Sequence, residues 1–108
     1  MKDYSKSKLY VIQPMCVFDD GDIYIGSSTH KNLNQVFYSH ISGYYMYKEN
    51  RRKVKVSSYL LFDKYGVHNC HLELIENVNC NSADELKAIK RNYILNTKCI
   101  NIKSYGKK

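Results

Sequence analysis

Two short runs rich in β-branched and aromatic residues, joined by a turn-forming segment, constrain the fold of this chain most strongly. The runs span residues 9–12 and 23–25, and residues 19–22 between them read Asp-Asp-Gly-Asp. Asp and Gly are typical of tight turns, because Gly tolerates a positive φ and Asp hydrogen-bonds its own backbone. The pattern therefore predicts an antiparallel β-hairpin.

Apolar residues at helical spacing predict two helices after the hairpin. The first is expected over about residues 32–42, after a polar segment that offers helix caps. Its apolar face carries Leu33, Val36, Phe37, His40 and Ile41. The second helix is short: Ser57 or Ser58 caps it, and Gly66 ends it in a left-handed conformation. Its inward residues are expected to be Leu60, Leu61 and Tyr65.

A strand and a last helix complete the predicted elements. Residues 70–78 alternate enough to form a third strand, and Ser82 with Glu85 fits a capping box at a helix start. The apolar stripe of this helix is Leu86, Ile89, Tyr93 and Ile94. We therefore expect an α+β fold, a small three-stranded antiparallel sheet flanked by about three helices. It forms a single domain over residues 1–108, with a core over about residues 8–104.

The charge of the chain favours polyanionic partners. Its 108 residues contain 17 Lys and Arg against 10 Asp and Glu, a formal net charge of +7. So high a charge on one small domain creates an attractive potential toward phosphates. Nucleic acid is therefore the expected partner, and a basic protein with no such partner is the alternative.

Residues 43–55 combine tyrosines with cations, and we predict a loop or irregular arm there. Phosphates would meet its basic side chains and bases would stack on its aromatic rings. The expected nucleic-acid contacts are Tyr44, Tyr45, Lys48, Arg51, Arg52, Lys53 and Lys55. The alternative is an ordinary solvated loop, since lysine-rich loops are common in proteins that bind nothing.

Cysteine spacing and hydropathy bear on the compartment. No two of the four cysteines form a CxxC pair, so neither a zinc site nor a redox motif is indicated. Free thiols in a reducing compartment are expected. The sequence has no apolar run long enough for a signal peptide or a membrane span. We therefore expect an intracellular protein without a membrane partner; its oligomeric state stays open.

The hairpin carries two tyrosine motifs that resemble the signature of the GIY-YIG endonucleases. The second motif is complete at Tyr24, Ile25 and Gly26, whereas the first reads Lys8-Leu9-Tyr10, with only its tyrosine kept. The stretch Leu-Leu-Phe-Asp-Lys-Tyr-Gly over residues 60–66 resembles one common in giant-virus and phage members. The likeness covers roughly residues 8–104.

This resemblance implies a set of site residues. The tyrosine pair corresponds to Tyr10 and Tyr24, the histidine of the first helix to His40, and a late asparagine to Asn101. In the family these groups handle water and protons, an arginine clamps the phosphate, and a glutamate holds a divalent cation. One carboxylate and several waters suit Mg²⁺, which dehydrates reluctantly.

Two positions depart from the family pattern. Val36 stands where the arginine is expected, and Lys90 stands where the metal-binding glutamate is expected. A valine offers no donors to a phosphate, and a lysine repels the cation. Lys90 could instead take the place of the metal ion and contact a phosphate, beside Arg91.

The leading hypothesis is a catalytically degenerate GIY-YIG domain. It binds nucleic acid through the inherited cleft and the basic arm and needs no cofactor. The first alternative is an active, Mg²⁺-dependent DNA endonuclease that recruited Arg51, Arg52 or Arg91. The second is a protein-interaction module, for instance a viral factor, with a protein partner.

Overall fold

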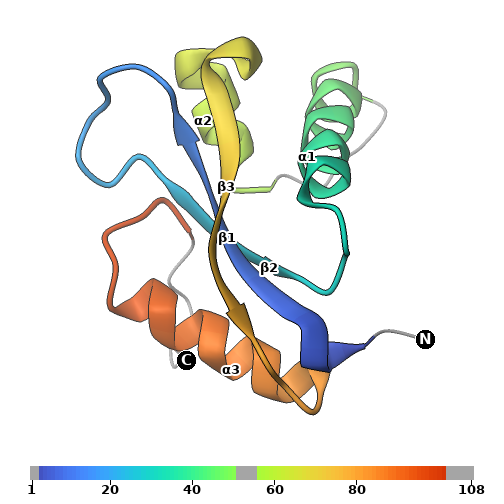
Figure 1. Ribbon diagram of the computed structural model, residues 1–108. Coiled ribbons are helices and arrows are strands. Elements are labelled where there is room, and N and C mark those ends of the chain that lie inside the picture. The colour runs from blue at the N-terminus through green and yellow to red at the C-terminus, as the bar shows by residue number, and fades with distance from the viewer. Residues whose placement is uncertain (1–2, 51–55, 102–108) are drawn as a thin grey trace.

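Three strands and three helices make up the computed structural model, which describes residues 3–50 and 56–101 (Figure 1). The elements are β1 (Ser7–Pro14), β2 (Tyr24–Ser28), α1 (Leu33–Lys48), α2 (Tyr59–Tyr65), β3 (Cys70–Val78) and α3 (Ala83–Leu95). Short 3-10 turns lie at Tyr4–Lys6 and Val67–Asn69. The predicted α+β class, with a three-stranded antiparallel sheet and three helices, is confirmed.

The sheet has the order β2-β1-β3, and β1 is antiparallel to both neighbours. The predicted hairpin is therefore present, although its strands are longer than the apolar runs. Pro14 is the last residue of β1. Tyr10 in the central strand lies opposite Gly26 on one side and Leu74 on the other.

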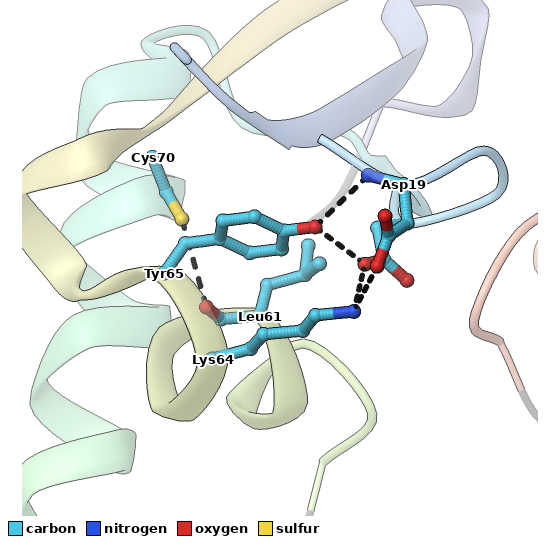
Figure 2. Close-up of polar contacts among 6 residues, drawn as sticks. Asp19, Leu61, Lys64, Tyr65 and Cys70 are labelled. Carbon is cyan, nitrogen blue, oxygen red and sulfur yellow. Dashed lines mark hydrogen bonds and ion pairs between the residues drawn. The ribbon is translucent and has the colours of Figure 1, made fainter. Parts of the chain in front are cut away.

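The connection between β1 and β2 is tied to α2. Asp22 donates its backbone N–H to Asp19 O at 3.0 Å, and Gly21 has φ 91°, so the predicted turn forms here. Lys64 Nζ lies 2.7 Å from Asp19 Oδ2 and 2.8 Å from Asp22 Oδ2 (Figure 2). The Tyr65 hydroxyl donates to Asp22 Oδ2 and accepts from the Asp19 N–H. These bonds lower the pKa of Asp22 and hold the turn against the helix.

One hydrophobic cluster fills the space between the sheet, α1 and α2. Tyr10 and Ile12 of β1 are buried in it. From α2 it receives Tyr59, Leu61 and Phe62. The prediction that Leu60 faces inward is wrong, because Leu60 is 44% exposed. With Tyr59 as the first helical residue, the helical period turns positions 59 and 62 inward and position 60 outward.

The other face of the sheet is covered by α3. Neighbouring residues of a strand point to opposite faces, so Leu9 and Ile25 point away from Tyr10 and Gly26. Both are fully buried, as is Ile94 of α3, and Leu86 is 7% exposed. Figure 1 shows α3 on the far side of the strands from α1 and α2. The sheet is thus the middle layer. The hydrophobic core between the sheet and α3 is smaller than the core between the sheet, α1 and α2.

Helix α1 is longer than the sequence predicted. It runs through Gly43 to Lys48, so the loop expected from residue 43 onward is wrong as far as Lys48. A glycine inside a helix costs about 1 kcal/mol. Tyr44 offsets that cost, since its ring centroid lies 5.7 Å from Tyr59 and 5.3 Å from Phe62. Residues 51–55 of the predicted arm lie outside the described residues.

The predicted helix ends are largely confirmed. Gly66 follows α2 with φ 90°, although its ψ of 142° differs from that of a left-handed helical residue. At α3, Ser82 Oγ accepts from the Glu85 N–H, as a capping box requires. The Glu85 carboxylate accepts from the Asn81 N–H rather than from that of Ser82. The four cysteines are free, as predicted.

Replacing Gly26 with alanine should destabilise the protein by about 2 kcal/mol or more, because the core cannot absorb the added methyl group. A Cβ at position 26 would overlap the Tyr10 ring, which is buried and cannot move aside. Urea unfolding followed by circular dichroism measures the loss. Ser27→Ala, one residue further along β2, is the control and should change the free energy of unfolding little. Equal stabilities for Gly26→Ala and the wild type would contradict this packing.

Candidate functional site

His40, from the middle of α1, is hydrogen-bonded through both ring nitrogens. Its Nε2 lies 2.9 Å from the Tyr10 hydroxyl of β1, and its Nδ1 lies 2.9 Å from Ser58 Oγ at the start of α2. Ser58 is fully buried. A neutral imidazole has one N–H and one lone pair, so His40 donates one of these bonds and accepts the other. The histidine therefore joins the sheet and both helices above it.

Tyr24 completes this cluster from β2. Its ring meets the His40 ring edge-on, with centroids 5.4 Å apart, and the Tyr10 and His40 centroids are 6.0 Å apart. Aromatic rings favour this edge-to-face arrangement. The three residues that the sequence predicted as a group, Tyr10, Tyr24 and His40, are thus in contact in the fold.

Burial sets the protonation states of the cluster. It lowers the pKa of His40 to about 4, because the imidazolium would lose its hydration. Burial, with Tyr24 as a lesser cause, raises the pKa of Tyr10 well above that of an ordinary tyrosine. At neutral pH His40 is therefore neutral and Tyr10 is a protonated phenol. The cluster is uncharged and hydrogen-bonded within itself.

A cavity of about 940 Å³ opens beside this cluster. Its walls come from the start of the chain, the paired ends of β1 and β2, and the first turns of α1 and α3. His40 and Val36 lie in the wall, so the cavity reaches the edge of the tyrosine-histidine cluster. Among the residues that the structure describes, five lysines line it: Lys6, Lys8, Lys31, Lys87 and Lys90. Asp3 is the one carboxylate among these described lining residues.

The charge of this lysine cavity, as we call it, is poorly compensated by protein groups. Asp3 accepts from the backbone and the hydroxyl of Ser5, which lower its pKa. Lys8 Nζ donates to the carbonyls of Lys6 and His30, at 3.2 and 3.1 Å. Carbonyls are neutral acceptors, so these bonds orient Lys8 without cancelling its charge. An anion is therefore the complementary ligand.

Asn101, predicted as a supporting residue, binds the edge of β2. Its side-chain Oδ1 accepts from the Ile25 N–H at 2.8 Å, and its Nδ2 donates to the Ile25 carbonyl at 2.7 Å. Ile25 lies between Tyr24 and Gly26, so this amide fixes the backbone from which Tyr24 projects. Asn101 is not among the residues that line the cavity.

The predicted nucleic-acid contacts on the arm lie elsewhere. Tyr44 is buried and donates its hydroxyl to Asp63, so its ring is not available to stack on a base, contrary to the prediction. Tyr45 is 48% exposed, and Lys48 lies 3.4 Å from Asp63. Arg91 is exposed on α3. The remaining predicted contacts, Arg51, Arg52, Lys53 and Lys55, are outside the described residues.

Most of the residues that line the cavity were not predicted from the sequence. Lys87 and Lys90 are three residues apart on one helix and therefore neighbours on its surface, a spacing that was readable. Lys6 and Lys8 are two residues apart, but nothing in the sequence indicated that they meet Lys31 and the two lysines of α3. Ser58 was read as a helix cap; it occupies the cap position but bonds to His40 instead.

Comparisons with protein-family models, with curated proteins and with solved structures each give no match to this chain. Within residues 3–50 and 56–101, no group of three or more His, Cys, Asp or Glu side chains is placed to hold a metal ion. No helix of this described part has the length and apolar character to cross a membrane.

The depressed pKa of His40 makes stability depend on pH in a defined window. In the unfolded chain His40 has a pKa of 6.5, and in the folded chain its pKa is about 4. Between these two pH values the unfolded chain therefore binds a proton at His40 that the folded chain does not bind. Stability should therefore be complete above pH 6.5 and fall by roughly 3 kcal/mol as the pH drops toward 4. Urea unfolding at intermediate pH values measures this loss.

The matched variants are His40→Gln and His30→Gln. Gln at position 40 does not titrate, so the loss between pH 6.5 and 4 should shrink in His40→Gln and persist in His30→Gln, where the replaced side chain is exposed. If His40→Gln loses as much free energy of unfolding between pH 6.5 and 4 as the wild type does, the claim that His40 is buried in its neutral form is refuted.

Proposed function

We propose that this protein binds nucleic acid through the lysine cavity and does not cleave it by a metal-dependent route. The observation that carries the proposal is the charge of the cavity: the described part of the chain places five lysines and one carboxylate around a space of about 940 Å³. Phosphates are the anions that such a surface selects, since each contact also releases counterions from the nucleic acid.

The resemblance to GIY-YIG endonucleases supports the choice of nucleic acid over other polyanions. Tyr10, Tyr24 and His40 correspond to the catalytic group of that family, and both tyrosines contact His40. Val36 and Lys90, which stand for its arginine and glutamate, both line the cavity. We propose that the chain is a degenerate member of this superfamily. It retains the cleft of the family, and lysines now supply the charge of that cleft.

Three features of the site argue against hydrolysis. Val36 supplies no charge to a phosphate in the transition state, and loss of one such donor typically costs ~10² to 10³ in rate. Lys90 repels a divalent cation where a carboxylate would hold it. His40 has both nitrogens engaged, and Tyr10 resists deprotonation because burial raises its pKa. Neither is poised to accept a proton from water.

Binding through phosphates would be largely independent of sequence. Backbone contacts fix the position of a nucleic acid but carry no sequence information. Ser27, Ser28 and Thr29 also line the cavity, and their hydroxyl groups can donate to phosphate oxygens. We therefore expect a salt-dependent binding protein with weak sequence preference.

The test compares two exposed lysines, Lys87 in the cavity wall and Lys98 outside it. Lys87→Ala should weaken binding of a labelled oligonucleotide several-fold and reduce the salt slope by about 1. Lys98→Ala should change both quantities much less, since Lys98 pairs with Asp20. Fluorescence anisotropy at several NaCl concentrations gives the slope. Equal effects from the two variants, or binding that does not depend on salt, would contradict the proposal.

The same protein should leave supercoiled plasmid intact in the presence of Mg²⁺. Nicking that His40→Ala abolishes would establish an active endonuclease instead. Absence of any nucleic-acid binding would leave the protein-interaction module as the better account of the charged surface.

A further inference from the structure

Lys90 differs from the other lysines of the cavity in its surroundings. Three of the others are exposed: Lys6, Lys31 and Lys87. Lys8 is partly buried, but its Nζ donates to two backbone carbonyls. Lys90 is partly buried too, and within residues 3–50 and 56–101 its Nζ has neither a hydrogen-bond acceptor nor a carboxylate partner.

This environment disfavours the charged form of Lys90. A partly desolvated ammonium without a partner is unfavourable, because it gives up hydration and gains no bond in return. Lys87 lies one helical turn earlier and adds a like charge. Burial first, and then Lys87, lower the pKa of Lys90. Partial burial beside a second cation is the setting in which enzymes convert a lysine into a neutral, nucleophilic amine.

We propose that Lys90 is a nucleophile that forms an imine with the ring-opened sugar aldehyde of an abasic site in nucleic acid. This inference rests on the proposed function, because the other lysines of the cavity bring the phosphate backbone to Lys90. Intact nucleotides offer no such electrophile, since their sugar C1′ is bonded to the base. An abasic sugar exposes an aldehyde and so supplies the electrophile that an intact nucleotide lacks.

The step balances without a metal, an oxidant or a second substrate. The lone pair of Lys90 Nζ attacks the aldehyde carbon and a C–N bond forms. The carbonyl oxygen then leaves as water, taking both hydrogens of the neutral amine, and a C=N bond remains. Ser27 lines the same cavity, and its hydroxyl can relay a proton to the departing oxygen.

The experiment is reductive trapping on the full chain. A labelled oligonucleotide with one abasic site is incubated with the protein and cyanoborohydride, and mass spectrometry locates the modified lysine. We expect a covalent adduct at Lys90. Lys90→Arg keeps a cation but cannot form the imine, so the adduct yield should fall at least about tenfold. Lys98→Ala, which removes an exposed lysine outside the cavity, should retain adduct formation at Lys90.

Binding is measured separately, by anisotropy, on the same oligonucleotide after its aldehyde has been reduced to an alcohol. Wild type and Lys90→Arg should bind this unreactive oligonucleotide within about threefold of each other, because the other lysines of the cavity are the same in both. Binding without an adduct at Lys90, or an adduct spread over the exposed lysines, overturns this inference and leaves the proposed function standing. No binding to the reduced oligonucleotide overturns both.

Discussion

The hydrogen bond between the Tyr10 hydroxyl and His40 Nε2 is the interaction on which the rest of the structure depends. It joins the central strand to α1, and Ser58, bonded to the other nitrogen of His40, adds the start of α2. The bond needs Gly26, because a side chain at that position on β2 would occupy the space of the Tyr10 ring. Asn101 in turn fixes the backbone beside Gly26 through Ile25. A buried polar network of this kind specifies one arrangement, since any partner left unbonded would be costly.

The same network makes the His40 part of the cavity wall uncharged. His40 and its partner Tyr10 are uncharged at neutral pH because burial moves the pKa of each away from neutrality. The lysines of the cavity are on flexible side chains from three segments of the chain. Such a site attracts phosphates over a distance and holds them by charge, while its most rigid groups remain bonded to one another. Binding and proton transfer, which a hydrolase combines, are therefore uncoupled in the proposed account.

The predictable parts of the fold were those with a local physical cause. The hairpin followed from the Asp-Asp-Gly-Asp turn, β3 from alternation, and the start of α3 from Ser82. The length of α1 was not predictable, because Gly43 signals a stop that the packing of Tyr44 against α2 overrides. The tyrosine-histidine cluster was found only through a family resemblance, and three of the five cavity lysines only through the fold. Long-range assembly of single residues leaves no periodic trace in a sequence.

The central claim, that the lysine cavity is the nucleic-acid-binding surface, is tested most directly by mapping amide chemical shifts while an oligonucleotide is added. The account predicts that the largest shifts fall on residues of the cavity wall, such as Ser28, Lys31 and Lys87. Residues near Lys64 and Asp22, where the charges are paired, should move little. Largest shifts around that paired cluster, or across α2, would contradict the claim.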